Sequence, residues 1–187
     1  MTKPPEMTLA IIGAGPLGQS LALRAAQAGI GVVLEDVMPS NLRHAQEQLR
    51  QALGEALHAS KNRVAVTFVS TVEDAVREAD LAIDCVPDEL ESKLEIFSLL
   101  DRMAPPKTIL LTPTKALSIA DLASCTYRAE RCLAIALGAQ ELATDAAARG
   151  SVVPLRRTAK TDADAEALVV HFWSLLGCSV AVETDCA

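Results

Sequence analysis

The chain has 187 residues, half of them hydrophobic and only 3% aromatic, and its formal net charge is −7. The length suffices for one well-packed domain, and an acidic chain without a Lys/Arg cluster is not expected to bind nucleic acid. No apolar run approaches the roughly 20 residues that cross a bilayer, and the N-terminal segment lacks a signal-peptide core. The five cysteines form no Cys-x-x-Cys pair, so we expect reduced thiols, no metal site and a cytoplasmic protein.

Strands and helices alternate along the chain. Residues 8–12 are predicted to form a strand, the helix after it ends at Gly29, and a second strand covers residues 31–35. A longer helix opens at Pro39, with apolar residues at the spacing of a helix laid on a sheet. Thr71 can cap one short helix, and Ser118 can begin another. The other predicted strands are 63–69, 81–86, 108–112, 132–137, 152–155 and 179–183, and the other long helices are 89–103 and 162–176.

This alternation predicts an α/β fold, with a doubly wound and mostly parallel sheet in a single domain over residues 1–187. A core of Ala, Val, Leu and Ile with few aromatics suits a parallel sheet that helices bury on both faces. Ligands of such sheets bind at the carboxyl ends of the strands. The residues that fall there are Gly13, Asp36, Pro87 and Thr112.

A glycine-rich loop follows the first strand. Gly13 permits the tight turn off the strand, Gly15 lets a pyrophosphate approach the backbone, and Gly18 lets helix and strand pack closely. The diphosphate would lie at the positive end of the following helix. Asp36 ends the second strand, where such folds place a carboxylate that accepts from the ribose hydroxyls. Together these residues predict a dinucleotide site, and Glu35 is expected to point outward and add to the repulsion of a 2′-phosphate, which favours NAD over NADP.

Longer segments of the chain resemble the NAD-binding domain of the 3-hydroxyacyl-CoA dehydrogenases, which have the Rossmann fold. The similarity lies in the glycine loop, in Val33-Leu34-Glu35-Asp36, and most specifically in residues 79–111, with Lys93 and Phe97 on the helix there. The resemblance implies NAD as cofactor and 3-hydroxyacyl-CoA as the substrate class, within fatty-acid metabolism. The NAD contacts that it implies are Gly13, Gly15, Leu17, Gly18, Asp36, Cys85, Val86, Asp88 and Lys93, to which we add the Thr112 hydroxyl.

The catalytic residues of the family are not matched. Its general base is a His in a G-L-H-F-F-N-P segment, and the corresponding stretch of this chain places Ala136 at that position. The Glu that orients the base would fall at Pro154, or at Ala148 if nothing is inserted. The S-N-T-S loop of the family reads Thr112-Pro113-Thr114-Lys115 here. We therefore assign no catalytic residue.

Two kinds of side chain remain as substitute bases. His44, His58 and His171 are predicted to lie on helices away from the strand ends, as ordinary half-buried or solvated histidines. Lys115 lies in the loop beside the expected nicotinamide position, where a desolvated lysine can act as an acid or a base. A solvated lysine at the start of a helix is the alternative.

Three functions are left open. The chain is expected to bind NAD(H) without the usual His–Glu pair. It can instead be an active dehydrogenase, with Lys115 as a relocated base or with a partner chain that completes the site. The third is a scaffold that acts only by contact. The helical domain that follows in the family is expected to be absent, which would uncover Val169, Phe172, Trp173 and Leu176 and favour a homodimer or a hetero-complex.

Overall fold

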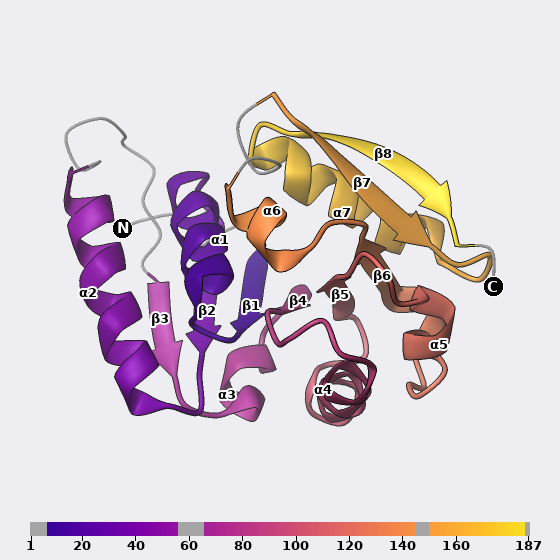
Figure 1. The fold of residues 1–187 in the computed structure, drawn as a ribbon, viewed down its shortest axis with the longest axis horizontal. Helices are drawn as coiled ribbons and strands as arrows, with labels where there is room; N and C mark the ends of the chain where they lie inside the picture. Colours follow the sequence, from indigo (N-terminus) through magenta and orange to yellow (C-terminus); the bar gives the residue numbers. More distant parts are fainter. Residues whose placement is uncertain (1–6, 56–65, 145–149, 186–187) are drawn as a thin grey trace.

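The computed structural model describes residues 7–55, 66–144 and 150–185, which form one sheet with helices on both faces (Figure 1). Each strand is parallel to its neighbours except at the β6–β7 pair, which is antiparallel. The predicted doubly wound, mostly parallel sheet is therefore confirmed. Across the sheet the strands are β3 (Val66–Val69), β2 (Gly31–Glu35), β1 (Thr8–Ile12), β4 (Leu81–Asp84), β5 (Ile109–Pro113), β6 (Cys132–Ile135), β7 (Val152–Arg157) and β8 (Ser179–Thr184).

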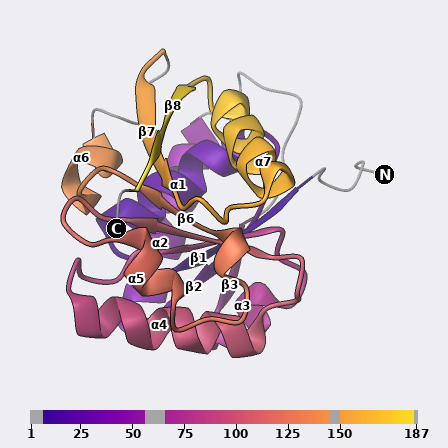
Figure 2. The same ribbon diagram turned by 90° about the vertical axis from the view of Figure 1, so that its right-hand side faces the viewer.

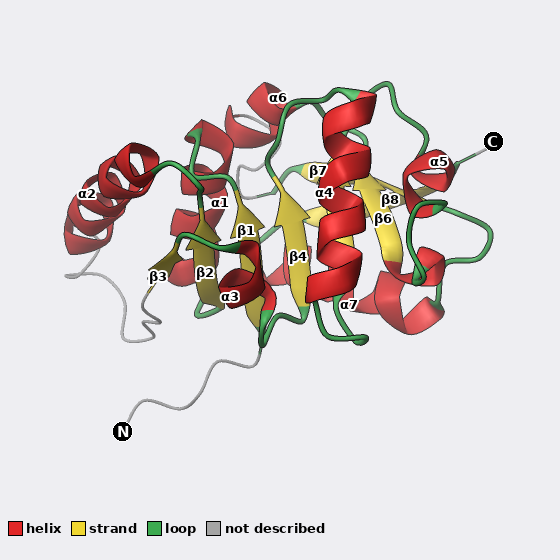
Figure 3. Cartoon of the chain, turned by 90° about the horizontal axis from the view of Figure 1, so that it is seen from below, coloured by secondary structure: helices red, strands yellow, loops and turns green. Residues whose placement is uncertain are grey.

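The helices make two layers around the sheet (Figures 2 and 3). Alternate residues of each strand point to opposite faces, so Leu9 and Ile11 of β1 join one apolar cluster and Ala10 and Ile12 join the other. The first face is covered by α1 (Pro16–Gln27), α2 (Pro39–Glu55), α6 (Ala139–Thr144) and α7 (Ala163–Leu175), and the second by α3 (Val72–Val76), α4 (Leu90–Met103) and α5 (Ile119–Ala123).

Two short helices begin at the predicted capping residues. The Thr71 hydroxyl accepts from the Asp74 N–H at the start of α3, and the Ser118 hydroxyl accepts from the Asp121 N–H at the start of α5. These bonds satisfy backbone donors that have no partner inside the helix. Asp185, directly after β8, also accepts from the Ile119 N–H at 2.7 Å. The last strand is thereby tied to the middle of the chain.

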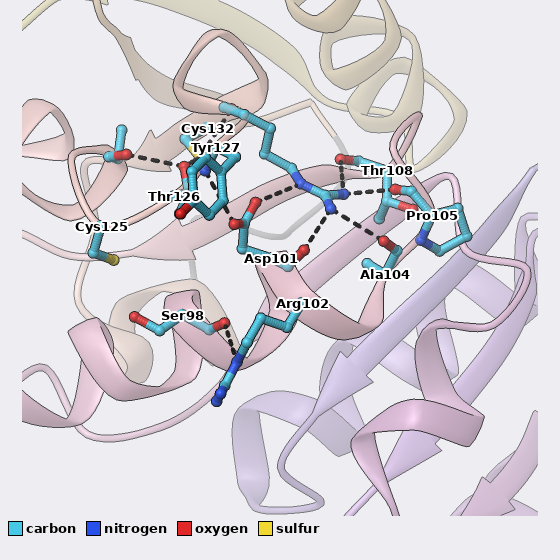
Figure 4. A network of polar contacts seen from close by, with 12 residues as sticks. Ser98, Asp101, Arg102, Ala104, Pro105, Thr108, Cys125, Thr126, Tyr127 and Cys132 are labelled. Atoms are coloured by element: carbon cyan, nitrogen blue, oxygen red, sulfur yellow. Dashed lines mark hydrogen bonds and ion pairs between the residues drawn. The ribbon is translucent and has the colours of Figure 1, made fainter.

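The buried Arg128 binds the C-terminal end of α4, where Figure 4 labels Asp101 and Ala104. The Arg128 guanidinium pairs with the Asp101 carboxylate at 2.9 Å. Its remaining N–H groups donate to backbone carbonyls of the last helical turn and the following loop, which belong to Asp101, Ala104, Pro105 and Thr108. Carbonyls at the end of a helix need such external donors. Arg128 therefore fixes the entry into β5, the strand that carries Thr112.

The C-terminal part of the chain differs from the prediction. Val169, Phe172 and Trp173 are completely buried and Leu176 is 5% exposed, so the expected apolar docking surface does not exist in the described structure and that prediction is wrong. The reason is that β7 turns antiparallel to β6 and, with β8, extends the sheet beneath α7.

Some bounds also differ. The predicted strand over residues 132–137 ends at Ile135, and the short helix α6 follows unpredicted. Residues 63–65, predicted as part of the third strand, lie outside the described residues. Within the described ranges, no helix is long and apolar enough to cross a membrane, and no cluster of His, Cys, Asp and Glu could hold a metal ion.

Candidate functional site

The order of the sheet reverses between β1 and β4, because β2 and β3 lie on one side and β5 to β8 on the other. Ligands of doubly wound sheets bind at such a switch point. Gly13 follows β1 with a φ of +110°, and Cys85 follows β4. The positive φ calls for glycine, and a Cβ on Gly13 would also lie 3.3 Å from the Cys85 Cβ, a tight contact.

The two later glycines of the loop have different surroundings. A Cβ on Gly18 would lie 1.9 Å from the Gly13 carbonyl oxygen, so Gly18 lets α1 pack against the end of β1. At Gly15 a Cβ would meet no atom within 4 Å. Gly15 caps α1 without a side-chain bond, and Pro16 follows in the first turn. The fold therefore needs glycine at Gly18, whereas at Gly15 it leaves open space beside the N-terminus of α1, where a phosphate group would fit.

Asp36 joins the end of β2 to the glycine loop. Its Oδ2 accepts from the Ala14 N–H at 2.9 Å, and its Oδ1 accepts from the Met38 N–H at 2.8 Å. The Asn41 side-chain amide donates to the same carboxylate. Asp36 is 8% exposed, so the carboxylate has a fixed orientation. The two parts of the motif, 22 residues apart, are thus brought into direct contact.

Glu35 does not point outward as predicted. It is 5% exposed, and burial, assisted by the neighbouring charge of Asp36, raises its pKa from 4.5 to about 7. The side chains alternate along β2, so Glu35 lies on the face opposite Leu34. The dinucleotide side of the site therefore presents the Asp36 carboxylate, with Glu35 turned into the protein.

A buried ion pair lies below the ends of β4 and β5. The Lys93 ammonium contacts Asp84 Oδ1 at 2.7 Å and Thr112 Oγ1 at 2.9 Å, and all three side chains are completely buried. Asp84 Oδ2 has no hydrogen-bond partner among the described residues. Burial raises the Asp84 pKa, and the Lys93 charge opposes that shift. Lys93 thus orients the Thr112 hydroxyl at the end of β5. The contact between Lys93 and NAD stays a prediction.

Cys85 and Val86 are half-buried where β4 ends, and Asp88 is exposed in the loop that follows. Burial, with the nearby Asp84 charge, raises the pKa of the Cys85 thiol far above its usual range. The thiolate is the nucleophilic form of cysteine. Cys85 therefore borders the switch point as a small apolar group rather than as a nucleophile.

Lys115 carries two contacts near these residues. Its backbone N–H donates to Asp88 Oδ2 at 3.2 Å, and its ammonium contacts Glu141 Oε1 at 2.6 Å. Glu141 also accepts from the Gly138 N–H, and the hydrogen bond from Lys115, then that from Gly138, lowers the Glu141 pKa. Lys115 and Glu141 are both about half exposed. Lys115, the candidate substitute base, is therefore a half-exposed ammonium group in an ion pair with Glu141.

Ala136, predicted at the position of the family's base, lies beside Pro154, predicted at the position of the orienting Glu. The Ala136 N–H donates to the Pro154 carbonyl at 2.8 Å, which supports Pro154 over Ala148 as the counterpart of the orienting Glu; Ala148 lies outside the described residues. On the same face of β7 as Pro154, the Arg156 guanidinium donates to the carbonyls of Thr114, Lys115 and Leu117. Arg156 thus restrains the loop that follows β5.

Exposed helical positions hold two of the histidines. His44 on α2 and His171 on α7 are solvated, as predicted, and His58 lies outside the described residues. Sequence reasoning did not single out Asn41, Asp84, Glu141 or Arg156. An acid inside the apolar strand β4, with a lysine nine residues later, was a signal for Asp84. The contacts of Glu141 and Arg156 join distant segments and had no local signal.

Comparison with known proteins agrees with this geometry. Residues 8–136 match the family model described as 3-hydroxyacyl-CoA dehydrogenase, NAD binding domain. The chain is 32% identical over 131 residues to the "Probable 3-hydroxybutyryl-CoA dehydrogenase" of Bacillus subtilis, a match that covers 65% of this chain and 45% of that protein. It is 34% identical over 120 residues to the 5-formyl-3-hydroxy-2-methylpyridine 4-carboxylate 5-dehydrogenase of Mesorhizobium japonicum, covering 61% and 38% of the two chains.

Among solved structures, that of an NAD⁺-dependent 5-formyl-3-hydroxy-2-methylpyridine 4-carboxylic acid 5-dehydrogenase is similar with a TM-score of 0.80 and 25% identity, over 96% of this chain and 58% of that one. The chain spans less than half the length of the curated relatives that it matches. Because the family model covers more than two thirds of the chain, the chain belongs to the family of NAD-binding domains of the 3-hydroxyacyl-CoA dehydrogenases.

Proposed function

We propose that this chain binds NAD(H) at the glycine loop and Asp36 and lacks the base with which its relatives oxidise 3-hydroxyacyl-CoA. The observation that carries the proposal is the bond from the Ala14 N–H to Asp36 Oδ2 at 2.9 Å. It holds a carboxylate at the end of β2 beside the N-terminus of α1, so that one ligand can reach both with its ribose and its diphosphate.

The proposal assigns each predicted contact to one part of the dinucleotide. The diphosphate would lie over Gly13, Gly15, Leu17 and Gly18, where Gly15 leaves room, and the adenosine ribose would lie at Asp36. The nicotinamide would lie across the switch point, beside Cys85, Val86, Asp88 and the strand end with Thr112, below which Lys93 lies. When bound, NAD would supply the hydride acceptor. The residues of the chain bind and orient it.

The positions at which the family carries its base and the orienting Glu support binding without catalysis. A hydroxyacyl oxidation needs a base for the hydroxyl proton, and Ala136 and Pro154 have no group that can accept one. If the chain is instead an active dehydrogenase, Lys115 is the base, and its position beside Asp88 favours that assignment. The ion pair with Glu141 opposes it, because the Lys115 ammonium is already engaged by a carboxylate at 2.6 Å. An active site completed by a partner chain and a scaffold without a ligand are two further candidate functions.

The test is a titration of the purified chain with NAD, NADH and NADPH, followed by thermal unfolding and calorimetry. We expect NAD or NADH to stabilise the chain, by about 2.7 kcal/mol at a free concentration of one hundred times Kd, and NADPH to bind more weakly. The Asp36→Ala variant should lose this discrimination, while Asp121→Ala, at an exposed helix position, should keep it. An equal response to NADH and NADPH, or none to millimolar NADH, would contradict the proposal.

A further inference from the structure

Both oxygens of the Asp36 carboxylate already accept hydrogen bonds from the protein. The Met38 N–H bonds to Oδ1 and the Ala14 N–H bonds to Oδ2. The Asn41 Nδ2 atom lies 3.2 Å from Oδ1 and 3.1 Å from Oδ2, so one amide N–H is shared between the two oxygens as a bifurcated bond. A carboxylate offers about four lone-pair positions in all, and the amide covers the remaining position on each oxygen. A pair of hydroxyls that donated to both oxygens would have to displace it.

A ribose presents two neighbouring hydroxyls, and the proposed contact at Asp36 uses them as donors. The two backbone donors belong to the glycine loop and to the entry into α2, so they cannot leave without a change in the backbone. Asn41 is an exposed side chain on the first turn of α2, and rotation about its side-chain bonds suffices to remove it. The Asn41 amide nitrogen lies almost equally far from both carboxylate oxygens, so it stands where a pair of hydroxyls that bridged them would stand.

We propose that Asn41 occupies the adenosine-ribose position of the ligand-free chain and is displaced when the dinucleotide binds. This inference rests on the proposed function, since it concerns the same site. Asn41 is thus a positioning residue that acts through Asp36 and sets the affinity for ligands with a ribose diol. A ligand without the diol has no need to displace it.

Removal of the amide separates this role from a purely structural one. In an Asn41→Ala variant each carboxylate oxygen keeps one backbone donor, so Asp36 keeps its orientation while two acceptor positions become available to the ribose. The free chain loses the bonds from Asn41, and its Tm should fall slightly or stay unchanged. The affinity for the dinucleotide should rise. A residue that only supported the local fold would lower both the Tm and the affinity.

The experiment is calorimetric titration of the whole chain and its variants with NADH, ADP and 2′,3′-dideoxy-ADP. Relative to the unmodified chain, we expect Asn41→Ala to bind NADH and ADP about threefold to tenfold more tightly, the range of one modest hydrogen bond, and to bind 2′,3′-dideoxy-ADP equally well. Gln48→Ala, which removes an exposed amide farther along α2, should leave all three affinities unchanged.

Two results would overturn the inference alone. In the first, the unmodified chain binds NADH and Asn41→Ala binds it no more tightly. In the second, Asn41→Ala gains as much affinity for 2′,3′-dideoxy-ADP as for ADP. If neither the unmodified chain nor the variant binds NADH or ADP, the proposed function fails, and the inference fails with it. These outcomes are distinguishable because the first two require measurable binding to the unmodified chain.

Discussion

The two sides of the switch point use their polar groups differently. On the nucleotide side, residues 13–41, the Asp36 carboxylate accepts from two backbone N–H groups and from the exposed Asn41 amide, and open space adjoins Gly15. On the substrate side, residues 84–156, the charged groups are engaged with one another or with the backbone. Lys93 contacts Asp84, Lys115 contacts Glu141, and Arg156 binds loop carbonyls.

Under the proposed function, one sheet edge would keep a binding function on the first side and lack a reaction on the second. Dinucleotide binding relies on backbone geometry and one carboxylate, which a few glycines and Asp36 provide. Proton transfer relies on a side chain with a suitable pKa at one position, and in our proposal that position is Ala136, directly after β6. A chain with this structure can therefore keep the first function independently of the second.

The largest expected effect concerns the buried ion pair on the substrate side. Lys93→Met leaves the Asp84 charge buried without a partner, so we expect a loss of about 3–5 kcal/mol in the free energy of unfolding. Urea unfolding measures it. Lys107→Met removes an exposed lysine from its pair with Asp80 and should cost less than about 1 kcal/mol. Equal effects of the two variants would mean that the Lys93 pair is not the buried support described above.

Much of the nucleotide side could be predicted from the sequence, because its signals are local. The glycine spacing and the acid after β2 form one short motif with a fixed separation, and elsewhere in the chain the caps Thr71 and Ser118 act within a few residues. The direction of β7 and the burial of Trp173 could not be predicted, because both depend on the pairing of distant strands. The burial of Glu35 was missed for a similar reason, since a strand-end acid is exposed or buried according to what packs against it.

The next effect is a pH dependence on the nucleotide side. The unfolded chain loses the Glu35 proton near pH 4.5, whereas the folded chain keeps it to about pH 7. The stability that this group contributes is therefore fully present below pH 4.5 and is lost as the pH rises through 7. We expect Glu35→Gln to gain roughly 2–3 kcal/mol relative to the unmodified chain between about pH 5 and pH 8. Urea unfolding across that range measures it, and a constant difference would refute the shifted pKa.

The smallest expected effect on stability separates the two later glycines. Gly18→Ala places a Cβ against the Gly13 carbonyl, and we expect it to cost about 1–3 kcal/mol. In Gly15→Ala the new Cβ would meet nothing within 4 Å among the described residues, so the stability should change by less than about 0.5 kcal/mol, while the affinity for NADH should fall. If Gly15→Ala bound NADH as well as the unmodified chain, the open space would not be the diphosphate position.

The most direct test of the central claim is NADH formation from 3-hydroxybutyryl-CoA by a chain whose NADH binding has been measured in the same preparation. A general base contributes about 10²- to 10⁴-fold to such a reaction. We therefore predict NADH binding without measurable turnover, for the chain itself and for Lys115→Ala. Turnover of several per second in the unmodified chain, lost in Lys115→Ala, would contradict the account and would show an enzyme with a relocated base.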